Sequence, residues 1–212
     1  MIEIDKLLHK IIKSQKYENR LNNIYSSNKN IFPNRNDVFR AFKLCPLSKT
    51  KVVIFGQDPY YTKGVADGLA FSTRSNKTPA SLKNIFKEIK LEYPNSLFSS
   101  NNLESWANQG VLLLNTSLTV EENLPLKNSL LWMDFIREIL NLINNHCNNI
   151  IFVLWGNQAI KLKKYISKNH YILESSHPSP LSANKGFIGN NHFKKINEIL
   201  KSLNLDTINW NT

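Results

Sequence analysis

Hydrophobic and polar positions alternate along this chain in segments whose period changes between that of a helix and that of a strand. The first segment predicts an amphipathic helix, because apolar residues recur at helical spacing while lysines occupy the other face: Ile4, Leu7, Leu8, Ile11 and Ile12. A polar stretch over 26–36 follows, with Pro33 as a breaker, and the pattern over 38–44 predicts another short helix.

From residue 51 onward, short apolar runs alternate with longer amphipathic stretches. The apolar runs predict strands at 51–55, 111–114, 150–154 and 171–173. Helical spacing predicts helices at 79–93, 131–145 and 193–203, with a short helix after residue 156. Strands buried on both faces and separated by helices indicate an α/β fold, a three-layer α/β/α sandwich with a central four-stranded parallel sheet. Without a repeat or linker, we expect a single domain over 1–212, with an N-terminal helical segment over about 1–35.

The residues that follow the four predicted strands carry the candidate chemistry. They are Gly56-Gln57-Asp58, Asn115, Gly156-Asn157 and Ser176-His177-Pro178-Ser179. In open parallel sheets, ligands bind at the carboxyl ends of the strands. A carboxylate, an amide, a glycine turn and an imidazole are therefore expected to converge on one edge of the sheet.

Each of these groups also has a structural interpretation. Asp58 can cap a turn before Pro59, and an asparagine such as Asn115 often caps a turn or a helix. A lone histidine is more often structural than catalytic, although two prolines at alternate positions stiffen the loop after His177. The small hydroxyl residues between those prolines suit contacts with phosphate.

Composition narrows the class of partner. With 27 Lys and Arg against 16 Asp and Glu, the net charge of +11 suits a polyanion such as DNA, although a solvated basic surface explains it equally well. Cys45 and Cys147 match no metal-ligand spacing and are expected to be free thiols. The chain shows neither an apolar signal segment nor a run that spans a bilayer, so we expect a cytoplasmic protein. The sequence offers no site for a metal or an organic cofactor, so we expect neither.

Four motifs, in order, resemble those of the family-1 uracil-DNA glycosylases, and the similarity runs from about residue 38 to 210. The motifs are Gly-Gln-Asp-Pro-Tyr at 56–60, Asp-Gly-Leu-Ala-Phe-Ser at 67–72, Gly-Val-Leu-Leu-Leu-Asn at 110–115 and His-Pro-Ser-Pro-Leu-Ser at 177–182. The resemblance implies a monomeric repair enzyme that flips uracil out of single- or double-stranded DNA and hydrolyses its N-glycosidic bond, leaving an abasic site.

The resemblance also implies roles for individual residues. Asp58 would position the attacking water and stabilise positive charge on the deoxyribose, and neutral His177 would donate a hydrogen bond to uracil O2. Four further residues would form the uracil pocket: Gln57 through its backbone, Tyr60 against C5, Phe71 by stacking, and Asn115 at the N3 and O4 edge. The expected DNA contacts are Ser81, Pro178, Ser179 and Ser182, with Leu181 as the wedge that fills the space of the flipped nucleotide.

Several positions depart from the family pattern. Tyr61 and Asp67 stand where histidine is common, and Asn157 stands where serine is. The proline-rich loop is reduced to residues 78–81, and acidic residues at 121–122 replace a basic stretch, so we expect weaker DNA affinity or altered salt dependence. The main alternative is a non-catalytic DNA-binding protein that retains the fold. A broader mismatch glycosylase would commonly lack Asp58 and Tyr60, and a metal-dependent hydrolase would need a second acidic loop.

Overall fold

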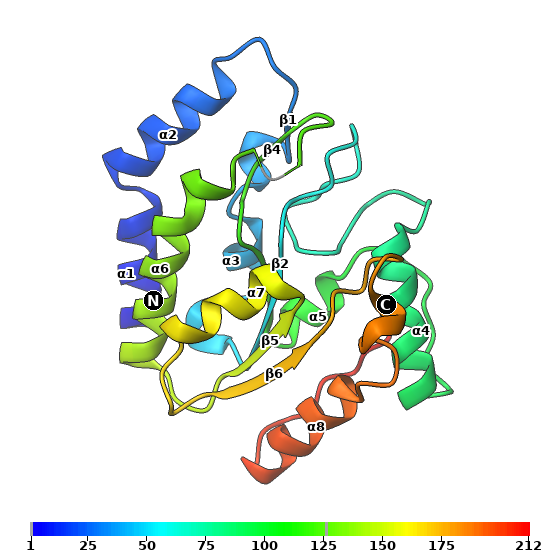
Figure 1. The fold of residues 1–212 in the computed structure, drawn as a ribbon. Coiled ribbons are helices and arrows are strands. Elements are labelled where there is room, and N and C mark those ends of the chain that lie inside the picture. Colours follow the sequence, from blue (N-terminus) through cyan, green and yellow to red (C-terminus); the bar gives the residue numbers. More distant parts are fainter. Residues whose placement is uncertain (1, 126) are drawn as a thin grey trace.

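A parallel sheet of four strands forms the centre of the molecule, in the order β3-β2-β5-β6 (Figure 1). The computed structural model describes residues 2–125 and 127–212. The strands are β2 (Val52–Gly56), β3 (Val111–Asn115), β5 (Ile151–Trp155) and β6 (Tyr171–Ser175). Val52 pairs with Val111 on one side and with Ile151 on the other, so the carboxyl ends of neighbouring strands are level. The predicted four-stranded parallel sheet is confirmed.

Helices cover the sheet on both sides (Figure 1). One layer contains α1 (Glu3–Ile12), α2 (Gln15–Tyr25) and α6 (Ser129–His146), and the other contains α4 (Ala80–Glu92) and α8 (His192–Ser202). The three layers confirm the predicted sandwich. The shorter helices are α3 (Arg40–Leu44), α5 (Glu104–Asn108), α7 (Asn157–Ile160) and the 3-10 turns η1 (Arg35–Asp37), η2 (Leu47–Lys49), η3 (Lys161–Tyr165) and η4 (Ala183–Lys185).

Burial follows the apolar pattern with one exception. Every residue of β2, β3 and β5 is buried, as expected for strands covered on both faces. The same expectation is wrong for β6, where Tyr171 and Glu174 are exposed. This strand lies at the edge of the sheet and is hydrogen-bonded to β5 alone. Among the described residues, no helix has the length and apolar character needed to cross a bilayer.

Helix α2 lies within the predicted N-terminal helical segment, whose second helix the sequence pattern did not delimit, and the pattern missed α5 and a small antiparallel pair. Helix α2 buries only Tyr17 and Leu21, and it is attached to α6 by a two-pronged ion pair in which Arg20 contacts Asp134 at 2.8 and 2.9 Å. In the stretch predicted to be an irregular polar segment, β1 (Ile31–Phe32) pairs with β4 (Val120–Glu121). This pairing attaches the N-terminal part of the chain to the loop that precedes α6.

Candidate active site

Residues from three of the four strand ends line a cavity of about 190 Å³. Its lining is Gln57, Asp58, Pro59, Tyr60, Tyr61, Leu69, Phe71, Ser81, Asn115, Pro125 and His177. Gly156 and Asn157 instead line a neighbouring cavity of about 380 Å³, which shares Gln57 and His177 with the first. The smaller cavity lies below the roughly 300–1,000 Å³ of pockets for drug-sized ligands, so it suits one planar ring. A larger cavity of about 530 Å³ lies among α1, α2 and α3, away from the strand ends.

The loop after β2 is held against the end of β3. A Cβ atom at Gly56 would lie 2.2 Å from Asn115 Oδ1, so only glycine allows the buried amide to occupy its place. The pairing continues beyond the strands, because the N–H groups of Thr116 and Ser117 donate to the carbonyls of Gly56 and Gln57, each at 2.9 Å. The Gln57 amide also donates to Asp58 Oδ2 at 3.2 Å. These contacts fix the carboxylate and the Asn115 amide on one side of the cavity.

The hydrogen bonds of His177 determine its tautomer. The backbone N–H of Ser179 donates to His177 Nδ1 at 3.0 Å, so the proton of the neutral ring sits on Nε2. Burial lowers the pKa of His177 below its ordinary value, which favours the neutral ring. The loop itself is anchored by Asn84, whose amide donates to the Pro178 carbonyl at 2.8 Å, and by the Ser182 hydroxyl, which donates to the His177 carbonyl at 2.8 Å.

Gly156 allows the imidazole to approach the end of β5. Its φ of +87° favours glycine, and a Cβ atom there would lie 2.8 Å from His177 Cβ. This glycine therefore determines how close the histidine comes to the sheet.

The aromatic side of the cavity is formed by Phe71 and Tyr60. The Phe71 ring lies 5.9 Å from the His177 ring and 5.6 Å from the Trp155 ring, measured between centroids. Its backbone has a φ of +65°, a left-handed conformation that costs an L-residue about 1–2 kcal/mol. The hydroxyl of the half-buried Tyr60 donates to the Phe71 carbonyl at 3.0 Å, and desolvation raises the pKa of Tyr60.

The residues predicted to contact DNA differ in exposure. Leu181 is 86% exposed, which leaves its side chain free to enter a duplex. The Ser179 and Ser182 hydroxyls lie 3.0 Å apart and share a hydrogen bond, and Ser81 lies in the first turn of α4 at the cavity wall. Pro178 is buried, so its ring faces the protein.

Sequence reasoning missed two buried acids that hold the chain between the His177 loop and α8. Glu88 and Glu92 lie on the apolar face of α4, where only apolar residues were expected. Glu88 accepts the N–H groups of Gly189 and Asn191 at 2.6 and 3.1 Å, and Glu92 accepts that of Lys194 at 2.5 Å. Burial, with the neighbouring charge of Glu88, raises the pKa of Glu92 to about 7. Glu88 therefore holds the segment that leads into α8, and Glu92 accepts N–H groups in the first turn of that helix.

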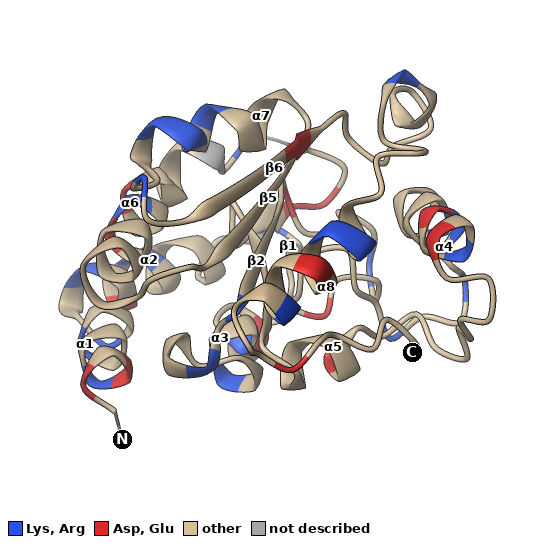
Figure 2. Cartoon of the chain, turned by 90° about the horizontal axis from the view of Figure 1, so that it is seen from below, with Lys and Arg blue, Asp and Glu red and all other residues tan. Residues whose placement is uncertain are grey.

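Charge around the site is more balanced than the sequence suggests. Glu121 accepts from Lys29 and Lys127 at 3.1 and 2.7 Å, which locally offsets one of the two extra acidic charges. Figure 2 shows Lys and Arg on helices on both sides of the sheet.

Within the described part of the chain, no group of three or more His, Cys, Asp or Glu side chains is placed to hold a metal ion. Both cysteines are free thiols, as predicted.

Comparison with known proteins shows which family this chain resembles in sequence and in structure. The model of the "Uracil DNA glycosylase superfamily" matches residues 42–201. The chain is 53% identical over 186 residues to a uracil-DNA glycosylase of Mycoplasmopsis pulmonis, covering 87% of this chain and 84% of that protein. It is 46% identical over 194 residues to a Borrelia duttonii protein of the same name, covering 90% and 87% of the two chains. The crystal structure of mimivirus uracil-DNA glycosylase superposes with a TM-score of 0.89 at 29% identity, over 100% of this chain and 88% of that one.

Proposed function

The chain belongs to the uracil DNA glycosylase superfamily, and from this membership we propose that it is the repair enzyme that releases uracil from DNA. It hydrolyses the N-glycosidic bond and leaves an abasic site, the first step of base excision repair. The observation that carries the proposal is the single-ring cavity at the strand ends, which collects Asp58, Phe71, Asn115 and His177. We propose that one domain over residues 1–212 acts as a monomer in the cytoplasm on single- and double-stranded DNA.

Base flipping follows from the size and place of the cavity. A base stacked in a duplex cannot reach a pocket at the end of a sheet, so the nucleotide must rotate out of the helix at a cost of a few kcal/mol. Leu181 is the side chain suited to offset that cost, because an apolar wedge can fill the vacated space and it is 86% exposed. Ser81, Ser179 and Ser182 hold phosphates on either side of it, on a loop that buried Pro178 stiffens.

His177 stabilises the leaving base. When the bond between C1′ and N1 breaks, its electron pair remains on uracil, and negative charge develops on O2. The Nδ1 atom already accepts from Ser179, so the Nε2 proton is available to donate to that oxygen. A fixed donor of this kind is worth about 10²–10³ in rate.

Asp58 acts on the opposite side of the bond. Its carboxylate stabilises the positive charge that develops on the deoxyribose and positions the water whose oxygen bonds to C1′. The water proton passes to the carboxylate, so the step balances without another reactant. The Gln57 amide, which donates to Asp58 Oδ2 at 3.2 Å, orients the acid.

The remaining pocket residues select uracil. Asn115 reads the N3 and O4 edge with one donor and one acceptor. Phe71 stacks on the ring, the backbone of Gln57 contacts the base, and Tyr60 occupies the position that the methyl group of thymine would need. The half-buried setting of Tyr60 supports this role, because its ring lines the cavity and its hydroxyl is held by the Phe71 carbonyl at 3.0 Å.

The test is release of free uracil from oligonucleotides that carry one uracil, single- and double-stranded, with chelator present. Matched oligonucleotides with thymine at that position are the control. We expect uracil release and an alkali-labile abasic site, with no release of thymine. Binding to the uracil oligonucleotide without release would overturn the proposal and favour the non-catalytic DNA-binding alternative.

A further inference from the structure

Phe71 presents its ring to the cavity from a backbone conformation that non-glycine residues rarely adopt, with φ at +65°. Such a conformation persists only where the surrounding structure holds the chain firmly. The Tyr60 hydroxyl holds the Phe71 carbonyl at 3.0 Å, and the Ala70 N–H donates to the Leu113 carbonyl at 3.1 Å. The position of the stacking ring therefore depends on what fixes residues 69–72.

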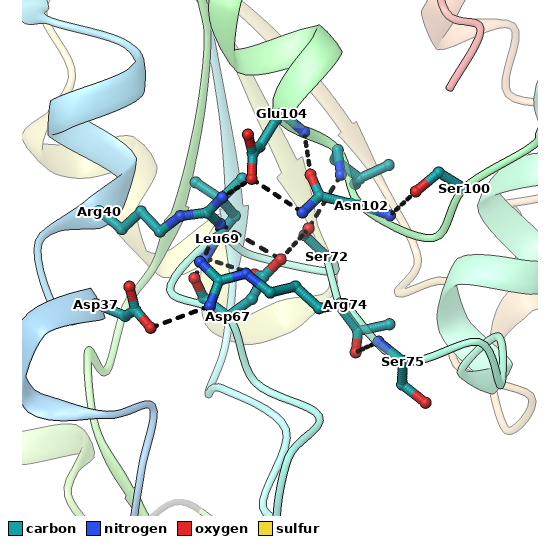
Figure 3. A network of polar contacts seen from close by, with 12 residues as sticks. Asp37, Arg40, Asp67, Leu69, Ser72, Arg74, Ser75, Ser100, Asn102 and Glu104 are labelled. Carbon is teal, nitrogen blue, oxygen red and sulfur yellow. Dashed lines mark hydrogen bonds and ion pairs between the residues drawn. The ribbon is translucent and has the colours of Figure 1, made fainter.

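The carboxylate of Asp67 holds Leu69 and Ser72, which stand on either side of Phe71 in the sequence (Figure 3). Its Oδ1 atom accepts the N–H of Leu69 at 3.1 Å, and its Oδ2 atom accepts the hydroxyl of Ser72 at 2.7 Å. The Ser72 oxygen accepts in turn from the Leu103 N–H at 3.0 Å. One side chain that is 1% exposed thus closes a short loop with Phe71 inside it.

Arg40 supplies the opposite charge that this burial requires. Its Nη1 atom lies 3.4 Å from Asp67 Oδ2 and donates to the Asp67 carbonyl at 3.0 Å, and Nη2 pairs with Glu104 (Figure 3). Burial raises the pKa of Asp67, while hydrogen bonds from Ser72 and Leu69 and the charge of Arg40 oppose that shift. A buried carboxylate without such a partner would be strongly destabilising.

Gly68 allows α3 to approach the loop this closely. Its φ is +90°, and a Cβ atom there would lie 2.9 Å from Arg40 Cβ and 2.2 Å from the Asp37 carbonyl oxygen. The absence of a side chain at Gly68 therefore allows Arg40 to lie close to Asp67.

We propose that Asp67, paired with Arg40, is a positioning residue that fixes the Phe71 ring for stacking on the flipped base. This inference rests on the proposed function. A carboxylate suits this role because its two oxygens accept from Leu69 and Ser72 at the same time, one on each side of Phe71.

The test is a double-mutant cycle with Asp67→Asn, Phe71→Ala and the double variant. The measurements are the Kd for free uracil, kcat and KM on a single-stranded uracil oligonucleotide, and affinity for a thymine oligonucleotide. We expect Asp67→Asn to raise the Kd for free uracil about 10-fold and to lower kcat/KM roughly 10- to 100-fold, with affinity for thymine DNA unchanged. In the Phe71→Ala background the same substitution should have almost no further effect.

Arg74→Met is the matched control, because it removes another guanidinium from the same cluster. The Arg74 side chain is 54% exposed and pairs with Asp37 at 3.4 Å. This variant should leave the Kd for uracil unchanged. If Asp67→Asn does not fold, Ser72→Ala replaces it in the cycle, since it removes one of the two hydrogen bonds. Unchanged uracil affinity, or an equal loss in both Phe71 backgrounds, would overturn the inference. A wild-type protein that releases no uracil would instead overturn the proposed function.

Discussion

Replacing Gly156 by alanine tests whether the glycine after β5 sets the position of the imidazole. The new Cβ would lie 2.8 Å from His177 Cβ, about 0.6 Å inside the 3.4 Å at which ordinary contact begins. Because both atoms belong to constrained loops, His177 must move by several tenths of an ångström. A misplacement of about 1 Å at a catalytic group can cost about 10²-fold, so we expect kcat to fall roughly 10- to 100-fold. The φ of +87° adds backbone strain of about 1–2 kcal/mol for alanine.

Gly189→Ala separates the two effects. Gly189 has a similar φ of +84°, but a Cβ atom there meets nothing within 4 Å. Backbone strain should lower the Tm of both variants, by about 2–8 °C for a chain of this size, and the clash with His177 should add to the loss in Gly156→Ala; thermal denaturation measures both. Single-turnover uracil release should fall only in Gly156→Ala. Wild-type kcat in Gly156→Ala, or an equal loss of kcat in both variants, would refute the reasoning.

Three further predictions concern selectivity and pH. Tyr60→Ala should release measurable thymine from a thymine oligonucleotide, while Tyr60→Phe, which keeps the ring, should not; continued rejection by the alanine variant would place the C5 barrier elsewhere. Because burial lowers the pKa of His177 below its ordinary value of 6.5 and the neutral ring is the donor, any acid limb of kcat from this group should be centred below pH 6.5; an acid limb centred above 6.5 would contradict this. The pKa of Glu92 is raised from 4.5 to about 7, so the folded protein holds this proton more tightly than the unfolded chain, and the resulting stability is lost as pH rises from 4.5 to 7. In urea denaturation, the free energy of unfolding of Glu92→Gln should therefore rise relative to that of the wild type across this range. Parallel pH profiles of the two proteins would argue against this.

The sheet and the longest helices could be predicted because burial alone dictates their sequence. Strands covered on both faces need uninterrupted apolar runs, and α6 shows a clear helical stripe. Helix α2 gives no such stripe, because it buries only Tyr17 and Leu21, and its ion pair joins Arg20 to Asp134, 114 residues away. The exposure of β6 also depends on strand order, which no local pattern encodes.

The candidate site could likewise be predicted only in part from the sequence. The rule that ligands bind at the carboxyl ends of parallel strands predicts that Asp58, Asn115 and His177 converge on one site. It could not predict that Arg40 pairs with Asp67, because that contact depends on the packing of α3 against a loop 27 residues away. Nor could it predict Glu88 within the apolar face of α4, because its partners are backbone N–H groups about 100 residues further along the chain.

Asp58→Asn tests the central claim most directly, because it keeps the size of the side chain and removes the charge on the sugar side of the bond. The measurement is single-turnover uracil release alongside the Kd for a uracil oligonucleotide, both compared with the wild type. We expect the rate of release to fall by about 10²-fold or more while the Kd changes by only about 2- to 3-fold. Release at the wild-type rate would show that the bond is broken by chemistry in which Asp58 takes no part.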